Sequence, residues 1–402
     1  ETNFKESPIG KIPKDWEVAD ADSTSVLKGF AFSSDFFNGK GEGIPLIRIR
    51  DLGKEETESH YSGPYDDTYL IRKGDILVSM DGEFNAYLWN GSEGLLNQRV
   101  CKIWSRNPAK LDNLFLYYGV QKPLKIIEMQ TSQTTVKHLL DRDTKRMKIP
   151  LPPYPEQEKV AEILSTVDLA VGKVDEVIAK TERLKKGLMQ ELLTKGIGHK
   201  EFKDTKIGKT PKTWQVIKLG EVCDQRSEIV QPSGEGKNRF IGLEHITSGE
   251  KITNNYDLDT DVKSSKFKFY VGDILYGKLR PYLDKAALAD FGGICSTDLL
   301  VLTAQDRKAL EEFLIYVIHS NRLIRHAIST TSGTNHPRTS WKAISRFKFG
   351  LPPLPEQQKV AEILSSVDRK LALERKEKAK LERIKLGLMD LLLTGKVRVK
   401  VD

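Results

Sequence analysis

The sequence has few cysteines and no long apolar run. Its three cysteines, Cys101, Cys223 and Cys295, are not spaced as a metal or redox pair. This usage fits a reducing cytoplasm and excludes a disulfide framework. No stretch of about 18 apolar residues occurs, so we expect no membrane span and no membrane partner. The start of the chain has neither an apolar signal core nor an initiator Met, and we therefore expect a cytoplasmic protein with a trimmed N-terminus.

Common catalytic motifs are also missing. The seven histidines are scattered, and only His319 and His326 lie seven apart on a probable helix, where a surface position explains them better than a metal. Residues 208–210 match the tail of a phosphate-binding loop, but Lys203 occupies the place of its first glycine. The Pro-Pro-Tyr at 152–154 follows a leucine, so it lacks the polar residue of amino-methyltransferase motifs. We predict a non-catalytic chain with no metal and no cofactor of its own.

Charge and length allow a nucleic-acid partner. The chain has 64 Lys and Arg residues against 56 Asp and Glu residues, for a net charge of +8. This balance favours a polyanionic partner, although an ordinary basic protein has the same balance. Its 402 residues suffice for two globular domains with helical connections.

The chain contains its own copy. Residues 151–168 return at 351–368 with fifteen of eighteen positions identical, and residues 9–18 return at 207–216 with seven of ten kept. Between these anchors the two halves differ widely, which indicates one duplicated scaffold with two different inserts. The repeat predicts two variable domains and two helical segments, at 1–153, 154–198, 199–353 and 354–402.

The helical segments carry a coiled-coil pattern. Pro155 and Pro355 suit the first helical turn, and apolar residues then recur at steps of four and three. Two such helices in one chain predict an antiparallel pair with a domain at each end. Glu374 and Lys378 fall where the first copy is apolar, so the seam there is either weaker or rotated. The predicted seam consists of Val160, Leu164, Val167, Val171, Val174, Ile178, Val360, Leu364, Val367 and Leu371.

The variable regions have mixed α/β (α+β) patterns. Short apolar runs entered from Gly74 and Gly272 indicate strands, and longer periodic runs indicate helices. We predict strands at 44–50, 75–78, 273–276 and 299–302, and helices at 111–122 and 310–326.

On these motifs the chain resembles the specificity subunit of type I restriction–modification enzymes over essentially its whole length. Three doubled motifs carry the resemblance: Ile-Gly-x-x-Pro-x-x-Trp at Ile9 and Ile207, Leu-Pro-Pro-x-Pro-Glu-Gln-x-Lys-Val-Ala-x-Ile-Leu at Leu151 and Leu351, and Gly-Leu-Met-x-x-Leu-Leu-Thr at Gly187 and Gly387.

The resemblance implies a DNA-reading role. Each variable region would be a target recognition domain that reads one half of a bipartite site in double-stranded DNA. The helices would be a ruler between the half-sites and would dock two modification subunits, which carry S-adenosylmethionine and methylate adenine. Restriction subunits, which use ATP and Mg²⁺, would join this complex in the prokaryotic cytoplasm, on the nucleoid. Because the two domains differ, we expect an asymmetric site with half-sites about one helical turn, roughly 34 Å, apart.

In the first domain, the candidate DNA contacts are side chains that can pair with base edges. The polar loop at 131–138, the Asn-Gln-Arg run at 97–99 and the arginines on one face of the predicted strand 44–50 are the candidates. Solvated connections and surface ion pairs are the alternative explanation. The candidate residues are Arg48, Arg50, Asn97, Gln98, Arg99, Thr131, Gln133, Thr134, Lys137 and His138.

In the second domain, the loop at 331–339 occupies the corresponding place and the run at 278–282 puts two cations beside an aromatic ring. The candidate residues are Lys278, Arg280, Tyr282, Thr334, Asn335, His336, Arg338 and Thr339. Two other functions share this architecture: a free-standing DNA-binding regulator and a protein scaffold that binds no nucleic acid. The regulator would bind its site without a partner, and the scaffold would show no salt-dependent affinity for DNA.

Overall fold

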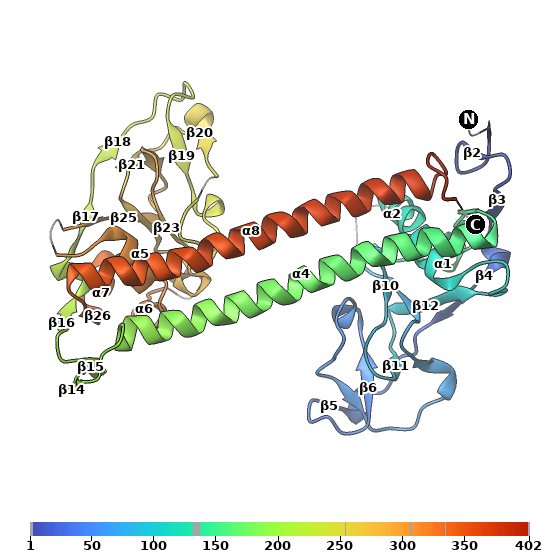
Figure 1. Ribbon diagram of the computed structural model, residues 1–402, viewed down its shortest axis with the longest axis horizontal. Coiled ribbons are helices and arrows are strands. Elements are labelled where there is room, and N and C mark those ends of the chain that lie inside the picture. Colours follow the sequence, from blue (N-terminus) through green and yellow to red (C-terminus); the bar gives the residue numbers. More distant parts are fainter. Residues whose placement is uncertain (1–2, 132–136, 254, 306–307, 334, 401–402) are drawn as a thin grey trace. The chain divides into compact units, whose positions relative to one another are not determined.

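The computed structural model describes residues 3–131, 137–253, 255–305, 308–333 and 335–400 (Figure 1). The chain forms two compact units. The first unit comprises residues 1–173 and 378–402, and the second comprises residues 174–377. Each unit therefore contains one variable region together with one half of each long helix.

The first unit is built on two small sheets. An antiparallel sheet has the order β10-β9-β12-β4, with bounds Ala86–Leu88, Ile76–Ser79, Val100–Ser105 and Thr24–Lys28. The second sheet has the order β5-β7-β6-β11-β8, with bounds Phe37–Asn38, His60–Tyr61, Ile44–Ile47, Gly94–Leu96 and Leu70–Ile71. The strands outside these sheets are β1 (Phe4–Lys5), β2 (Ile12–Pro13), β3 (Glu17–Ala19) and β13 (Ile149–Leu151). Its short helices are α1 (Asn113–Gly119), α2 (Gln121–Gln130) and α3 (Asp141–Thr144).

The second unit repeats this plan. Its antiparallel sheet has the order β17-β25-β22-β23, with bounds Cys223–Arg226, Leu299–Ala304, Ile274–Gly277 and Ala286–Leu288. The other sheet has the order β18-β21-β24-β19-β20, with bounds Ile229–Val230, Lys266–Phe269, Gly293–Cys295, Arg239–Ile241 and Asp257–Leu258. The remaining strands are β14 (Phe202–Thr205), β15 (Gly208–Pro211), β16 (Gln215–Lys218) and β26 (Lys348–Leu351), and the short helices are α5 (Glu311–Ile318), α6 (Asn321–Ser329) and α7 (Trp341–Ile344).

The two units differ at the sheet edges. In both, the five-stranded sheet contains one parallel pair, β6 with β11 and β19 with β24, flanked by antiparallel neighbours. The fifth strand is added beside β7 in the first unit and beside β21, at the opposite edge, in the second. The duplicated frame thus carries different surfaces, because edge strands are the part of a sheet that can change without disturbing its buried centre.

Each long helix begins at the first residue of a predicted helical segment and ends before that segment does. Helix α4 covers Tyr154–Lys195 and α8 covers Leu354–Leu392, each with its proline in the first turn. Gly196 and Gly395 follow the two helices with φ of +67°, the left-handed conformation that ends a helix and favours glycine. None of the helices described is both long and apolar enough to cross a bilayer.

Within each unit, the halves of α4 and α8 run antiparallel. In the first unit Val160 and Leu392 belong to one core cluster, and Asp168 pairs with Lys385. Residue numbers therefore increase along α4 in the direction in which they decrease along α8. In the second unit Leu192 clusters with Val360 in the same way. The predicted antiparallel pair is confirmed.

The predicted seam faces inward along both helices. Val160, Leu164, Val360, Leu364, Val367 and Leu371 are buried, and Val167, Val171, Val174 and Ile178 are half-buried. The heptad continues through Glu374, whose carboxylate accepts a hydrogen bond of 3.2 Å from Thr181. Since Glu374 remains at its heptad position, the seam has not rotated there; it has become polar.

Three local predictions are wrong. The predicted helix 111–122 is interrupted at Val120, where α1 gives way to α2. The predicted strand 44–50 ends at Ile47, because Asp51 accepts a hydrogen bond of 3.0 Å from the Arg48 N–H and closes a 3-10 turn over Ile49–Asp51. The predicted helix 310–326 is two helices, because the Ser320 hydroxyl caps a new helix by accepting from Leu323 N–H at 3.3 Å.

Candidate nucleic-acid interface

In the first unit, three chain segments meet at one corner of the antiparallel sheet. They are the turn after β9 (Met80–Gly82), the turn before β12 (Asn97–Arg99) and the segment Lys137–Leu139. Backbone hydrogen bonds join them: Met80 N–H to Arg99 O (2.9 Å), Leu139 N–H to Met80 O (2.7 Å) and Gly82 N–H to Lys137 O (3.0 Å). We call this place the first corner.

The second unit has the same corner. Its segments are Lys278–Arg280 after β22, Ser296–Asp298 before β25, and Pro337–Thr339. The hydrogen bonds are Lys278 N–H to Asp298 O (3.0 Å), Thr339 N–H to Lys278 O (2.9 Å) and Arg280 N–H to Pro337 O (2.8 Å). This second corner therefore matches the first bond for bond, although the sequences differ.

Side chains at the first corner surround one carboxylate. Asp81 lies 2.5 Å from His138 Nδ1 and 3.3 Å from an Arg99 nitrogen, and both basic groups are exposed. Gln98 is also exposed, and its backbone N–H donates to the carbonyl of Phe30, a residue that is 48% exposed. The corner thus offers a guanidinium, an imidazole, an amide and an aromatic face together, the groups that pair with base edges and stack on nucleotides.

At the second corner the charges are arranged differently. Arg338 Nε donates to Asp298 at 3.2 Å, so the acid lies on the turn before β25, whereas in the first corner it lies on the turn after β9. Lys278 is half-buried, and Arg280 and Tyr282 are exposed. Equivalent backbone frames therefore present different donor patterns, which physically supports different base preferences.

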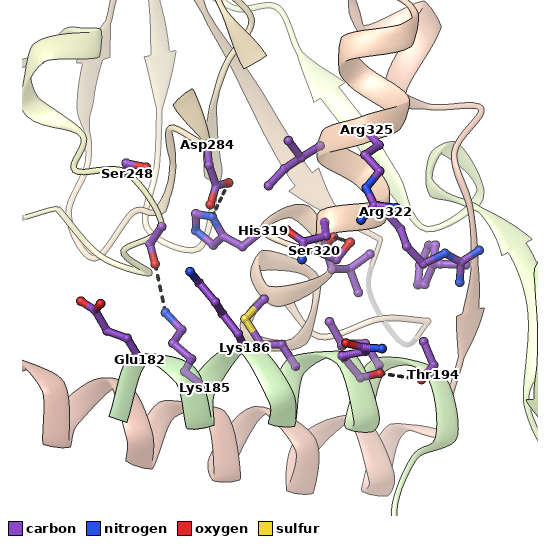
Figure 2. A pocket seen from close by; sticks show the side chains of 18 of the residues that line it. Glu182, Lys185, Lys186, Thr194, Ser248, Asp284, His319, Ser320, Arg322 and Arg325 are labelled. Atoms are coloured by element: carbon purple, nitrogen blue, oxygen red, sulfur yellow. Dashed lines mark hydrogen bonds and ion pairs between the residues drawn. The ribbon is translucent and has the colours of Figure 1, made fainter. Parts of the chain in front are cut away.

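The turn that carries Tyr282 is held in an uncommon backbone conformation. Arg280 and Asp284, on either side of the 3-10 turn Pro281–Leu283, have φ of +50° and +48°. The first corner has a glycine, Gly82, at the position of Arg280. A non-glycine residue in this region costs about 1 kcal/mol, so the surroundings must hold it in place. At Asp284 the contact that holds the turn is with His319, whose Nδ1 lies 2.8 Å from the Asp284 carboxylate (Figure 2).

Most of the predicted site residues that the structure describes come together at these corners, but their exposure varies. Asn97 and Thr339 are 5% and 4% exposed, and the Asn97 side-chain oxygen accepts from Gln98 N–H at 2.9 Å. Lys137 is half-buried, with its ammonium 3.9 Å from Glu128. We interpret these three residues as supports of the corners.

Other predicted residues lie apart from the corner contacts. Arg48 and Arg50 both donate to the Ser59 hydroxyl, and they make no contact with a corner side chain in the described part of the chain. The Thr131 hydroxyl donates to Ile127 O at 2.8 Å at the end of α2. Asn335 and His336 are exposed in the loop that leads to Arg338, whereas Gln133, Thr134 and Thr334 lie outside the described residues.

Sequence reasoning missed the acids Asp81 and Asp298 and the aromatic Phe30. The predicted contacts are mainly hydrogen-bond donors, yet a carboxylate can accept from the amino group of cytosine. Their position in the sequence could have identified the two acids, because Asp81 and Asp298 each lie in a turn next to a buried strand.

Repeated polar contacts fasten the short helices α1 and α5 to the long helices. In the first unit, the Asp168 carboxylate accepts from Tyr118 at 2.8 Å and pairs with Lys385 at 2.5 Å. In the second unit, Asp368 accepts from Tyr316 at 2.6 Å and pairs with Lys185 at 2.7 Å. Burial, reinforced by the carboxylate, raises the pKa of both tyrosines well above the usual value, so they remain neutral donors.

The lead-in tryptophans serve a second contact. Trp16 donates to Glu156 at 3.1 Å, and Arg398 donates to the same carboxylate at 2.8 Å. In the second unit, Trp214 donates to Glu356 at 2.9 Å, and the imidazole of His199 takes the place of Arg398, 2.7 Å from the same carboxylate. The two doubled motifs of the sequence therefore meet in space, one supplying the tryptophan and the other the glutamate.

Nothing in the described residues forms a metal site, since they contain no cluster of three or more His, Cys, Asp or Glu suited to an ion. All three cysteines are buried, and burial raises the pKa of Cys223 and Cys295 to about 12. Protonated, enclosed thiols are poor nucleophiles and poor metal ligands.

A duplicated α+β domain with a polar corner, fastened to a pair of antiparallel helices, defines a two-domain recognition protein. The family model described as the type I restriction modification DNA specificity domain matches residues 13–178 and 211–383, and the chain belongs to this family.

Relatives and a solved structure agree with this assignment. The chain is 29% identical over 414 residues to the type I restriction enzyme MjaVIII specificity subunit of Methanocaldococcus jannaschii, covering 100% of this chain and 97% of that protein. It is 33% identical to the EcoBI specificity subunit of Escherichia coli, over 64% of this chain and 59% of that protein. The crystal structure of the S subunit from M. genitalium has the same fold, with a TM-score of 0.61 at 17% identity, covering 94% of this chain and 96% of that one.

Proposed function

We propose that each recognition domain of this type I specificity subunit reads one half of an asymmetric, bipartite DNA site through its corner. The first corner would act through Gln98, Arg99 and His138, and the second through Arg280, Tyr282 and Arg338. The observation that carries the proposal is the match between the two corners: the same backbone bonds hold different donors and acids in each.

The corners suit base reading for a physical reason. Asp81 fixes Arg99 and His138, and Asp298 fixes Arg338, so these long side chains lose less conformational freedom on binding. A carboxylate beside a basic side chain also disfavours wrong DNA sequences. A mismatched nucleobase edge would leave one of these charged side chains without its hydrogen bond.

For the helices, we propose two roles. They set the spacing between the half-sites, and they dock two modification subunits, which carry S-adenosylmethionine and methylate adenine at N6. Restriction subunits, which use ATP and Mg²⁺, complete the complex in the cytoplasm. The chain itself is non-catalytic in this proposal and supplies binding and geometry alone.

The test is co-expression with the cognate modification subunit, followed by mapping of N6-methyladenine across the host genome. We expect one asymmetric, bipartite methylated motif. Replacing residues 199–353 with the corresponding region of a relative should change one half of the motif and leave the other half and the spacing unchanged. As a finer change, Arg338→Ala should relax one base position by about 1–3 kcal/mol of discrimination.

Two outcomes would contradict the proposal. A stable complex with an intact modification subunit but no methylated motif would favour the regulator or the scaffold, which salt-dependent DNA binding by the chain alone then separates. A domain exchange that altered both halves of the motif would show that the two corners do not act independently.

A further inference from the structure

Two arginines in the first unit converge on one buried serine hydroxyl. Arg48 and Arg50 lie at the 3-10 turn that follows β6, and a guanidinium nitrogen of each donates to Ser59 Oγ, from Arg50 at 3.2 Å. Ser59 is 8% exposed, whereas Arg48 is half-buried and Arg50 is exposed. We call these three residues the arginine cluster.

The arginine cluster has no counter-ion of its own. In the described part of the chain, the two guanidiniums contact the Ser59 hydroxyl and, for Arg48, the Phe37 ring, but no carboxylate. The buried Asp51 carboxylate is engaged instead by the backbone N–H of Arg48 at 3.0 Å. Because like charges repel, two guanidiniums that share one oxygen without an acid favour a bound anion.

Several donors of the arginine cluster also lack acceptors. Each guanidinium uses one of its several N–H donors within the described chain, and Arg48 Nε is buried without a hydrogen-bond partner there. The Ser59 oxygen accepts from both arginines, and no described atom accepts from its O–H. A buried N–H without a partner is uncommon, so it points to a group that the chain does not supply. The oxygens of a phosphate match these donors in charge and geometry.

The arginine cluster adjoins the first corner. Arg48 directly follows Ile47, whose carbonyl accepts from the Asn97 N–H of the corner at 3.1 Å. The Ser59 carbonyl accepts from the Leu46 N–H at 2.8 Å, which fixes the serine beside the end of β6. Backbone bonds therefore place the cluster next to the side chains that we propose to read bases.

The second unit lacks this cluster, although it has the same turn. Its 3-10 turn is closed by the same kind of bond, from the Gly242 N–H to His245 Nδ1 at 2.9 Å. By this correspondence Gly242 stands in the place of Arg48, and Glu244 stands in the place of Arg50. A glutamate repels a phosphate, so the anion site belongs to the first domain alone.

We propose that the arginine cluster binds one phosphate of the DNA backbone beside the half-site read by the first domain, an assignment that rests on the proposed function. Arg48 and Arg50 donate to non-bridging oxygens of this phosphate, and the Ser59 hydroxyl positions both guanidiniums. Every nucleotide carries the same phosphate, so the contact fixes the position of the duplex and adds no sequence preference. It also makes the two half-sites unequal in their electrostatic binding.

The test uses the full chain in complex with the cognate modification subunit, and short duplexes that contain the mapped methylation site. Single phosphates across both half-sites are replaced, one at a time, by neutral methylphosphonates, and dissociation constants are measured by fluorescence anisotropy. We expect one sensitive position, in the half-site that survives exchange of residues 199–353, where replacement weakens binding about tenfold. In Arg48→Ala with Arg50→Ala the same replacement should change binding by less than about twofold, because the contact is already lost.

Salt dependence provides a second readout. Arg48→Ala with Arg50→Ala should weaken the binding of cognate and random-sequence duplexes by the same factor. It should also reduce the slope of log affinity against log salt concentration by about 1, while the methylated motif stays the same. Arg48→Lys with Arg50→Lys keeps the charge and should retain the slope.

Lys40→Ala with Lys73→Ala provides the matched control, because it removes the same charge at exposed residues of the first unit outside the cluster. It should retain the sensitive phosphate. Circular dichroism with thermal melting checks that each variant is folded. The methylphosphonate series on the unmodified complex tests the phosphate contact even where an alanine variant fails to fold.

Three results would overturn the proposal. They are the absence of any phosphate whose replacement loses its effect in the alanine variant, an altered methylated motif in that variant, which would assign the arginines to bases, or loss of the modification subunit with unchanged DNA binding by the chain alone. The last result would make the cluster a protein contact. Failure of the proposed function is distinct, because the unmodified complex would then produce no methylated motif.

Discussion

The contact of Asp368 with Tyr316 and Lys185 provides a quantitative test of how a recognition domain is fastened to the helices. The side chains of Asp368 and Lys185 are 20% and 13% exposed, so solvent screens their pairing only partly. In Asp368→Ala, Lys185 keeps its hydrogen bond of 3.0 Å to the Gly249 carbonyl but loses its counter-ion. A charged hydrogen bond contributes about 1.5–3 kcal/mol, and an unpaired buried charge adds to the loss, so we expect about 2–4 kcal/mol of destabilisation.

Urea unfolding, followed by circular dichroism, measures this loss. The double variant Asp368→Ala with Lys185→Met should recover at least about half of it, because no unpaired ammonium remains. Asp168→Ala provides the matched measurement in the first unit, where Tyr118 and Lys385 make the same contacts. A loss below about 0.5 kcal/mol in Asp368→Ala, the range of an exposed ion pair, would refute the reasoning.

Three further predictions follow from the same structure. Leu164→Asp with Leu364→Asp places a carboxylate in the core of each unit, because both leucines are 0% exposed. The double change should lower the free energy of unfolding by at least about 3 kcal/mol per unit and abolish docking of the modification subunit. An intact complex would contradict the assignment of the seam. Arg338→Ala should alter discrimination at one base position. It should leave the melting temperature within about 2 °C of the unmodified chain, since an exposed ion pair contributes little to stability. A uniform loss of affinity across DNA sequences would instead indicate that Arg338 contacts a phosphate. Hydrogen bonds from Arg398 lower the pKa of Asp15, so the stabilisation from Asp15 is complete above the ordinary carboxyl pKa and is lost as the pH falls through the lowered value. Asp15→Asn should therefore destabilise by no more than about 1 kcal/mol at pH 7, and its effect should shrink as the pH falls below the ordinary carboxyl pKa; an effect that does not change with pH would contradict this assignment.

Local chemistry explains why the helices and the duplication could be predicted. The seam repeats every seven residues, and proline and glycine mark the ends of α4, so interactions between near neighbours determine these features. The buried strands β9 and β22 are continuous apolar runs entered from Gly74 and Gly272, which also leave a local signal. The mistaken strand at 44–50 failed because a side chain, Asp51, competed with sheet pairing, and hydrophobic alternation does not report such competition.

Tertiary structure decided which polar residues act together. Asp81, Arg99 and His138 are separated along the chain, and only the pairing of strand ends brings one carboxylate against a guanidinium and an imidazole. In the same way, Trp16 and Glu156 belong to different motifs, each visible in the sequence, but their contact spans 140 positions. The family, the duplication and the helical seam could be established without a structure, because they depend on local spacing. Folding alone decided the two corners, because their members meet only after distant strands have packed.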